Sequence, residues 1–354
     1  MRTEPVTDAS VWTGAELEAD RSWEYVLTDA HCAELEAALR GVKERGLALP
    51  AVTKEAFPLS SLGPVAANIA GDLKNGCGFA LMRRFPVEGY DYADIELMYW
   101  GLCMHIGTGI TQNGEAGFIH YVTDGALRPS QGKRGVGFPK ESKLHVDLMD
   151  VVSLLCVKQA PDDPPSRVAS TAAIYNAVLA QRPDGLARLY EGFEWGRMDE
   201  QGVGETATSG YKVPFFSEKN GQISCQYNRA WIRNGDLHKG REMSQSDSDL
   251  LDFVDAVADE VRLEFPFQPG DVQFCNNYTV LHGRAAHDVV PEEDRKRVLL
   301  RIWLDMQDVR AFADEAIIRY GIGRHGQLGW SADDIQSGRN ETARARRDDG
   351  AIRL

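Results

Sequence analysis

The segment from Leu144 to Ala160 constrains the fold more strongly than any other part of the chain. It begins Leu-His-Val-Asp, and its second half, residues 151–157, is largely apolar with several β-branched side chains. A short apolar run of this kind, followed by the turn sequence Pro-Asp-Asp-Pro-Pro at 161–165, is typical of a buried strand. Three further strand patterns lie downstream, at 261–265, 271–274 and 297–304. The middle and C-terminal thirds therefore favour a β-sandwich or barrel core with helices outside.

Helical patterns surround this predicted β core. Five stretches are predicted to be helical: 30–46, the stretch that follows Ser60-Ser61 and ends near Gly76, 91–105, 170–182 and 246–260. Thr28 or Asp29 could cap the first, and Leu250, Leu251, Val254 and Val257 recur at helical spacing in the last. Residues 78–82 form a strand pattern. The polar segment 183–245 offers only short strand-like pieces, at 213–216 and 222–227. The predicted fold class is mixed α/β with an all-β core.

No linker divides the chain, so we expect one domain over residues 1–354. Its expected parts are a helical N-terminal part (about 28–76), a β core (about 78–304), an inserted helical segment (about 183–260) and a polar C-terminal tail (about 334–354). The tail is highly charged and poor in apolar residues, which predicts loose structure.

Charge and cysteine content narrow the class of protein. The formal net charge of -14 disfavours phosphate backbones and anionic membranes, so we expect no nucleic-acid and no membrane partner. The six cysteines include no CxxC pair, which indicates free thiols in a reducing compartment. The N-terminus has no apolar signal core, and no apolar run is long enough to span a bilayer. We therefore expect a cytoplasmic protein that acts on a small molecule; a homo-oligomer remains open.

The pair His145 and Asp147 is the first chemical signal. On a strand, residues two apart point to the same face, so an imidazole and a carboxylate at this spacing can chelate one metal ion. The triplet occurs once among the eight histidines. Alone, it is equally compatible with a surface His–Asp pair at a strand end.

His282 and Arg297 make this signal more specific. His282 lies in Leu-His-Gly-Arg at 281–284, and Arg297 follows fifteen residues later in a strand pattern. Two histidines and one carboxylate leave three open positions on an octahedral iron, the arrangement of non-haem Fe(II) oxygenases. A buried arginine on a following strand can grip the far end of a dicarboxylate.

With these residues in order, the sequence resembles the taurine dioxygenase and clavaminate synthase-like family of Fe(II)- and 2-oxoglutarate-dependent oxygenases. The resemblance extends from about Gly78 to Leu304, and its motifs are 144–147, Ser166 with Ser170 and 175–176, 269–271, 281–284 and 297–301. It implies a double-stranded β-helix (jelly-roll) core, with an inserted segment that folds over the active site as a lid. It also implies that His145, Asp147 and His282 hold iron.

The resemblance assigns the co-substrate and the prime substrate to further residues. Arg297 and Ser166 would bind the distal carboxylate of 2-oxoglutarate, with Ser170 or Thr171 as alternatives because Pro164-Pro165 replaces the Gly-Gly that is frequent in relatives. Arg301 would hold an anionic group of the substrate, or else pair with a nearby acid. The other substrate-contact candidates are Gln112, Asn113, Leu148 and Arg284. His287 is expected to be an exposed loop residue.

The expected reaction uses Fe(II), 2-oxoglutarate and O2, and releases succinate and CO2 while an unactivated C–H bond is hydroxylated or desaturated. Halogenating relatives replace the metal-binding carboxylate with a small residue, so Asp147 argues against halogenation. The expected substrate is amino-acid-like, anionic or a natural-product scaffold. Two alternatives remain: a metal-binding jelly roll that binds a small molecule without turnover, and a zinc hydrolase. Arg297 favours the oxygenase over both.

Overall fold

The computed structural model describes residues 1–112, 117–124, 139–198, 201, 206–311 and 328–340. Its larger sheet has seven strands. Their spatial order is β1 (Glu24–Val26), β2 (Phe79–Arg83), β13 (Val272–Asn276), β6 (Val151–Lys158), β15 (Val298–Asp305) and β3 (Thr108–Ile110), and β4 (His120–Val122) also pairs with β15. The strand predictions at 78–82, 151–157, 271–274 and 297–304 all fall in this sheet.

The smaller sheet has four strands, and it carries much of the candidate site. Their order is β12 (Leu263–Phe265), β7 (Ser166–Ser170), β14 (Val280–Arg284) and β5 (Ser142–His145). All of its pairings are antiparallel. The sequence did not predict β14, because this strand is short and contains Gly283, which weakens a strand pattern.

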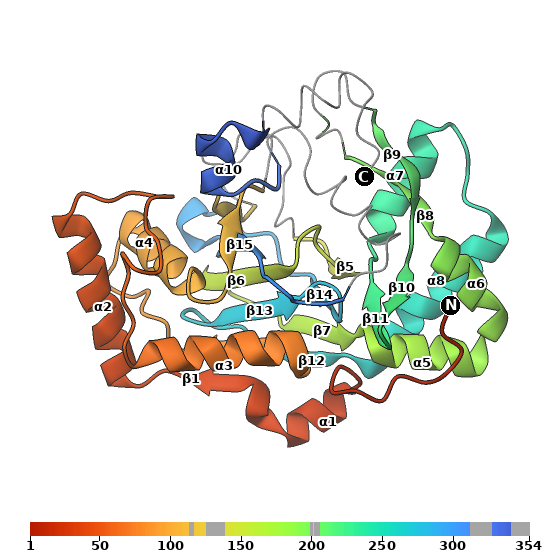
Figure 1. Cartoon of the computed structure of the whole chain (residues 1–354), viewed down its shortest axis with the longest axis horizontal. Helices are drawn as coiled ribbons and strands as arrows, with labels where there is room; N and C mark the ends of the chain where they lie inside the picture. The colour runs from red at the N-terminus through yellow and green to blue at the C-terminus, as the bar shows by residue number, and fades with distance from the viewer. Residues whose placement is uncertain (113–116, 125–138, 199–200, 202–205, 312–327, 341–354) are drawn as a thin grey trace.

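Because side chains alternate between the two faces of a strand, the apolar residues of the larger sheet pack into two separate cores. On β2, Phe79 and Leu81 pack in the same core as the small sheet, whereas Ala80 and Met82 pack against the N-terminal helices. The helices on that second face are α2 (Asp29–Glu44), α3 (Leu62–Asn75) and α4 (Tyr92–Cys103). Figure 1 shows α2 and α4 at the left edge of the molecule, far from β7 and β14.

Further helices cover the small sheet and the ends of the core. They are α1 (Gly14–Ala19), η1 (Arg21–Trp23), α5 (Thr171–Gln181), α6 (Pro183–Glu191), α7 (Arg229–His238), α8 (Gln245–Val261), η3 (Glu293–Arg295) and α10 (Ala332–Gln336). Helices α5, α6 and α8 contribute apolar side chains to the core that they share with the small sheet. Thr28 caps α2 by accepting from His31 N, and Ser244 caps α8 by accepting from Asp247 N, whereas the Ser61 side chain makes no cap at the start of α3.

The segment 183–245 differs from its prediction. It contains helices α6 and α7 and two hairpins, β8 (Phe193–Gly196) with β9 (Thr208–Val213), and β10 (Phe216–Lys219) with β11 (Gln222–Cys225). The predicted strand at 213–216 is wrong, because Val213 ends β9 and Phe216 begins β10. Pro214 lies between them and has no N–H for a ladder.

The structure also bears on the predicted C-terminal tail and on the predicted free cysteines. The predicted loose tail from Asp334 begins inside α10, where Ser331 and Asp334 form a reciprocal cap, while residues 341–354 lie outside the described part. All six cysteines are free thiols; four are buried, and Cys32 and Cys77 are partly exposed. Within the described residues, no helix has both the length and the apolar character of a membrane span.

Candidate metal centre

Three side chains from the small sheet and the loop after it come together. His145 ends β5, and His282 lies opposite it in the antiparallel register of β14. Asp147 lies two residues beyond the end of β5, so the prediction that it shares a strand face with His145 is wrong; the loop turns its carboxylate toward the histidines. One ligand atom from each residue lies within 4.8 Å of the others. The three residues can therefore hold one metal ion.

A backbone hydrogen bond orients the His145 ring. Its Nδ1 lies 2.7 Å from the carbonyl oxygen of Lys143, so Nδ1 carries the proton and donates. Nε2 then presents its lone pair 3.8 Å from Oδ1 of Asp147. This separation is too long for a hydrogen bond, and it matches two donors on one metal ion, which lie about 3 to 4 Å apart when each is about 2.1 Å from the ion.

His282 is buried as a neutral imidazole. Burial, together with His145 and Arg301, lowers the pKa of His282 to about 3, although Asp147 acts in the opposite direction. Its Nδ1 is buried without a hydrogen-bond partner in the described structure. Buried polar atoms are nearly always satisfied, so an unused nitrogen beside a second imidazole and a carboxylate fits a metal site.

Two donors hold the outer oxygen of Asp147. Oδ2 accepts hydrogen bonds from Arg301 Nη1 at 3.1 Å and from Trp303 Nε1 at 2.7 Å. Burial alone raises the pKa of Asp147, but the charges of Arg301 and His282 outweigh burial and hold that pKa well below its usual range. The carboxylate is therefore ionised, as a metal ligand must be.

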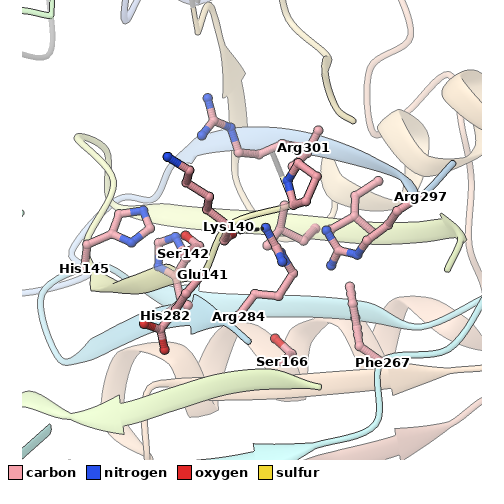
Figure 2. A pocket seen from close by; sticks show the side chains of 15 residues that line it. Lys140, Glu141, Ser142, His145, Ser166, Phe267, His282, Arg284, Arg297 and Arg301 are labelled. Carbon is pink, nitrogen blue, oxygen red and sulfur yellow. Dashed lines mark hydrogen bonds between the residues drawn. The ribbon is translucent and has the colours of Figure 1, made fainter. Parts of the chain in front are cut away.

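A cavity of about 550 Å³ opens beside the two histidines. Figure 2 shows His145 and His282 at one end, Arg297 and Phe267 at the other, and Arg284 between them. Besides these residues, the polar lining includes Lys140, Glu141, Ser142, Ser166 and Arg301. A smaller cavity of about 120 Å³ lies against Asp147 and is lined by Leu148, Asn228, Trp231 and Trp303. The ligand cluster thus lies between the two cavities.

Ser166 and Arg297 both line the larger cavity, as the resemblance implied. Ser166 Oγ donates to Gln273 Oε1 at 2.6 Å, and Arg297 Nε donates to Gln159 Oε1 at 2.8 Å. Burial and the neighbouring Arg284 lower the pKa of Arg297 to about 10. Nothing in the sequence indicated the two glutamines, because each lies on a different segment from the residue that it holds.

The alternative hydroxyls face elsewhere. Ser170 Oγ donates to the carbonyl of Ser10 at 2.5 Å and caps α5 by accepting from Ala173 N. Thr171 Oγ1 donates to the carbonyl of Tyr278 at 3.2 Å. Neither residue is among those that line the larger cavity, whereas Ser166 is.

The substrate-contact candidates fall in several places. Arg301 pairs with Asp147, which is the alternative that the sequence left open. Gln112 is fully buried and bonds to Arg301 instead of lining either cavity. Leu148 lines the smaller cavity and Arg284 the larger one. Asn113 lies outside the described residues.

The expectation that His287 is exposed is wrong. Its side chain is buried, because the chain after β14 folds back against the segment that precedes β5. The backbone N–H of His287 donates to the carbonyl of Pro139 at 2.9 Å. His287 is not part of the ligand cluster.

Two imidazoles and one carboxylate beside a cavity in a β core define the metal-site class of the non-haem iron oxygenases. Comparison with known proteins gives the same class. Residues 45–303 match the "Taurine catabolism dioxygenase TauD, TfdA family", and the chain belongs to this family. It is an Fe(II)- and 2-oxoglutarate-dependent dioxygenase, with iron as its cofactor and 2-oxoglutarate and O2 as co-substrates.

Two curated relatives align along most of the chain. FR-33289 synthase of Streptomyces rubellomurinus (strain ATCC 31215) is 30% identical over 315 residues, which cover 87% of this chain and 92% of the relative. The taurine hydroxylase-like protein SAT17 of Stachybotrys chartarum (strain CBS 109288 / IBT 7711) is 25% identical over 322 residues, 87% of this chain and 81% of the relative.

Solved structures share the fold at lower identity. The non-heme iron oxygenase OrfP, in complex with Fe and alpha-ketoglutaric acid, has a TM-score of 0.58 and 15% identity, and the match covers 80% of this chain and 94% of that chain. An asparagine oxygenase in complex with Fe(II), 3-hydroxyasparagine and succinate has a TM-score of 0.58 and 15% identity, over 80% and 93% of the two chains. The mixed α/β prediction is confirmed.

Proposed function

We propose that this enzyme hydroxylates an unactivated C–H bond of a small anionic or amino-acid-like substrate, with iron held by His145, Asp147 and His282. The observation that carries the proposal is the ligand cluster itself. Its donor atoms lie within 4.8 Å of one another, and its histidines line the same cavity as Ser166 and Arg297.

The orientation of His145 and the protonation states of His282 and Asp147 are those that metal binding requires. Nδ1 of His145 is occupied by the Lys143 carbonyl, which leaves Nε2 for the ion. His282 is neutral and Asp147 is ionised for the reasons given above. Bound Fe(II) would supply the open positions where 2-oxoglutarate and O2 meet, and the oxidising power for the C–H bond.

Arg297 and Ser166 are proposed to bind the distal carboxylate of 2-oxoglutarate. Arg297 lies at the end of the cavity away from the histidines, so a dicarboxylate can reach from the metal to this guanidinium (Figure 2). A guanidinium and a hydroxyl are strong donors to a carboxylate. Gln159 and Gln273 hold the two side chains and orient them.

The charge of the cavity supports an anionic substrate group. Lys140 and Arg284 line the cavity in addition to Arg297, and Arg301 is matched by Asp147. This excess of cations over the one acidic lining residue, Glu141, would attract both a dicarboxylate and an anionic substrate group. Fold neighbours described in complex with 3-hydroxyasparagine and (3S)-hydroxy-L-Arg support an amino-acid-like scaffold.

Hydroxylation is the proposed outcome, with desaturation as the alternative, because Asp147 occupies the position that halogenating relatives leave free. We also propose that the two sheets form a double-stranded β-helix (jelly roll) within one domain. The segment 183–260 would then act as a lid, since Trp231 and Asn228 from this segment line the cavity next to Asp147.

Turnover tests the proposal. The protein, incubated with Fe(II), ascorbate, 2-oxoglutarate and O2, should form succinate in step with hydroxylated product when a panel of amino acids and small anionic acids is offered. Asp147→Ala should abolish both products, and Arg310→Met, at a partly buried arginine that donates to the Ile223 carbonyl, should not. Succinate formation that survives Asp147→Ala would overturn the assignment.

A further inference from the structure

The outer oxygen of Asp147, Oδ2, accepts two side-chain hydrogen bonds. A carboxylate oxygen has about two lone-pair sites, and Oδ2 of Asp147 receives two donors, Arg301 Nη1 at 3.1 Å and Trp303 Nε1 at 2.7 Å. Both donors come from β15, two residues apart, so they share one face of that strand. Oδ1 is left facing Nε2 of His145. Oδ1 is therefore the oxygen of this carboxylate that faces the position between the histidines and Asp147 where an ion would bind.

Gln112 fixes Arg301 in turn. Its Oε1 accepts from Arg301 Nε at 2.8 Å, and its Nε2 donates to the backbone carbonyls of Arg301 at 2.7 Å and of Phe118 at 2.8 Å. The guanidinium of Arg301 also lies over the ring of Trp303, 4.8 Å from its centroid. One amide thus bonds to both the side chain and the backbone of Arg301, and the guanidinium has little freedom to turn toward a substrate.

We propose that Arg301 and Trp303 are positioning residues that make Asp147 bind iron through Oδ1 alone, and that Gln112 locks Arg301 in this task. The inference rests on the proposed function, in which Asp147 is a metal ligand. Because Oδ2 is engaged, the carboxylate occupies one coordination position and leaves the others for 2-oxoglutarate and O2. Recognition of an anionic substrate group then falls to Arg284 and Lys140 instead of Arg301.

The test separates iron affinity from 2-oxoglutarate affinity. Trp303→Phe removes the indole N–H and keeps an aromatic ring, whereas Arg301→Met removes charge and donors. Anaerobic titration of the full-length apoprotein with Fe(II), in competition with a chelator, should show about 10-fold weaker binding for Trp303→Phe and about 10- to 100-fold weaker binding for Arg301→Met. At saturating iron, 2-oxoglutarate affinity should change little in either variant.

The matched control is Arg297→Met, another buried arginine of the same cavity. It should weaken 2-oxoglutarate binding and leave iron affinity unchanged. Arg301→Lys, which keeps the charge, should recover part of the lost iron affinity. Melting temperatures of the apoproteins check folding, and Trp303→Phe decides the matter if Arg301→Met does not fold.

The outcomes distinguish this inference from the proposed function. Wild-type iron affinity in Trp303→Phe and in every folded Arg301 variant would overturn the positioning role while leaving the metal site intact. A wild-type protein that binds no Fe(II), or an Asp147→Ala variant that binds it equally well, would overturn the proposed function itself.

Discussion

Arg297 shows how a single residue is prepared for a ligand. Its side chain is only 4% exposed, and its hydrogen-bond partner Gln159 is neutral. Burial of a charge is costly, and burial together with the neighbouring charge of Arg284 lowers the pKa of Arg297 to about 10, although Asp124 acts in the opposite direction. A bound carboxylate would offset the cost. The geometry therefore favours a negatively charged co-substrate at this end of the cavity.

Substitutions of Ser166 and Ser170 should affect different properties, because Ser166 lines the cavity and Ser170 caps α5. Ser166→Ala should weaken 2-oxoglutarate binding by about 1 kcal/mol, roughly fivefold, with little change in melting temperature, because its hydroxyl lines the cavity. Ser170→Ala should instead lower the free energy of unfolding by about 0.5 to 2 kcal/mol, because it removes the cap of α5. Titration of 2-oxoglutarate and thermal unfolding of both variants check this; the opposite pattern would favour Ser170 as the anchor.

The low pKa of His282 predicts that the apoprotein loses stability in acid. Its pKa is about 3 in the folded chain, against an ordinary value of 6.5, so the unfolded chain binds more protons between these pH values. The free energy of unfolding should therefore fall as the pH drops from about 6.5 toward 3, by up to about 1.4 kcal/mol per pH unit from this residue. Urea unfolding at several pH values should give a shallower slope for His282→Asn. Equal slopes would contradict the assigned burial and neutrality.

At the scale of elements, the close approach of β14 to β5 sets the spacing of the two histidines. The ladder between them is irregular between His282 and Arg284, at Gly283. A Cβ atom at Gly283 would lie 2.6 Å from the carbonyl oxygen of Ser142 and 3.1 Å from the N atom of Leu144. Only glycine lets the two backbones meet here, and β5 carries His145.

Gly283→Ala should therefore push β5 away from β14 and separate His145 from His282. We expect iron affinity to fall by at least about 10-fold, together with a lower melting temperature. The matched control is Gly71→Ala on α3, where a Cβ atom would meet nothing within 4 Å and helix propensity should hold or raise stability. Iron binding by Gly283→Ala at wild-type strength would refute this role for the close approach.

The elements that the sequence predicted are those with strong local signals. The helix at 246–260 has a capping serine and recurring apolar residues, and the strand at 151–157 is an apolar run. In both cases the residues that stabilise the element lie within the segment itself, so its pattern can be recognised in the sequence. Strand β14 and helices α6 and α7 were missed because tertiary packing outweighs their weak patterns. Likewise, the turn that brings Asp147 to the histidines depends on contacts with Asn277, 130 residues away.

For the candidate site, the sequence predicted the candidate ligands but not the residues that support them. The identities of His145, Asp147, His282 and Arg297 follow from residue order and the resemblance. Their supporting partners, Gln112, Gln159 and Gln273, could not be predicted, because glutamine is common and each contact joins segments far apart in the sequence. The pairing of Arg301 with Asp147 is a product of the same long-range packing.

At the scale of the whole molecule, an acidic chain surrounds a cationic cavity. The net charge is -14, yet Lys140, Arg284, Arg297 and Arg301 all line the larger cavity. The small sheet supplies the two histidines and Ser166, β15 supplies Arg301, and Arg297 is the residue before β15. The two sheets and the loop after β5 therefore place the proposed metal ligands toward one end of the cavity and Arg297, the proposed carboxylate donor, at the other.

The most direct measurement is the anaerobic addition of Fe(II) and then 2-oxoglutarate to the full-length protein, followed by visible absorption. We predict one iron per chain and an absorption band that requires 2-oxoglutarate. The band should be absent in His145→Ala and Asp147→Ala, and in Arg297→Met it should need a higher 2-oxoglutarate concentration. A full-strength band in Asp147→Ala, or no band in the iron-loaded wild type, would contradict the account.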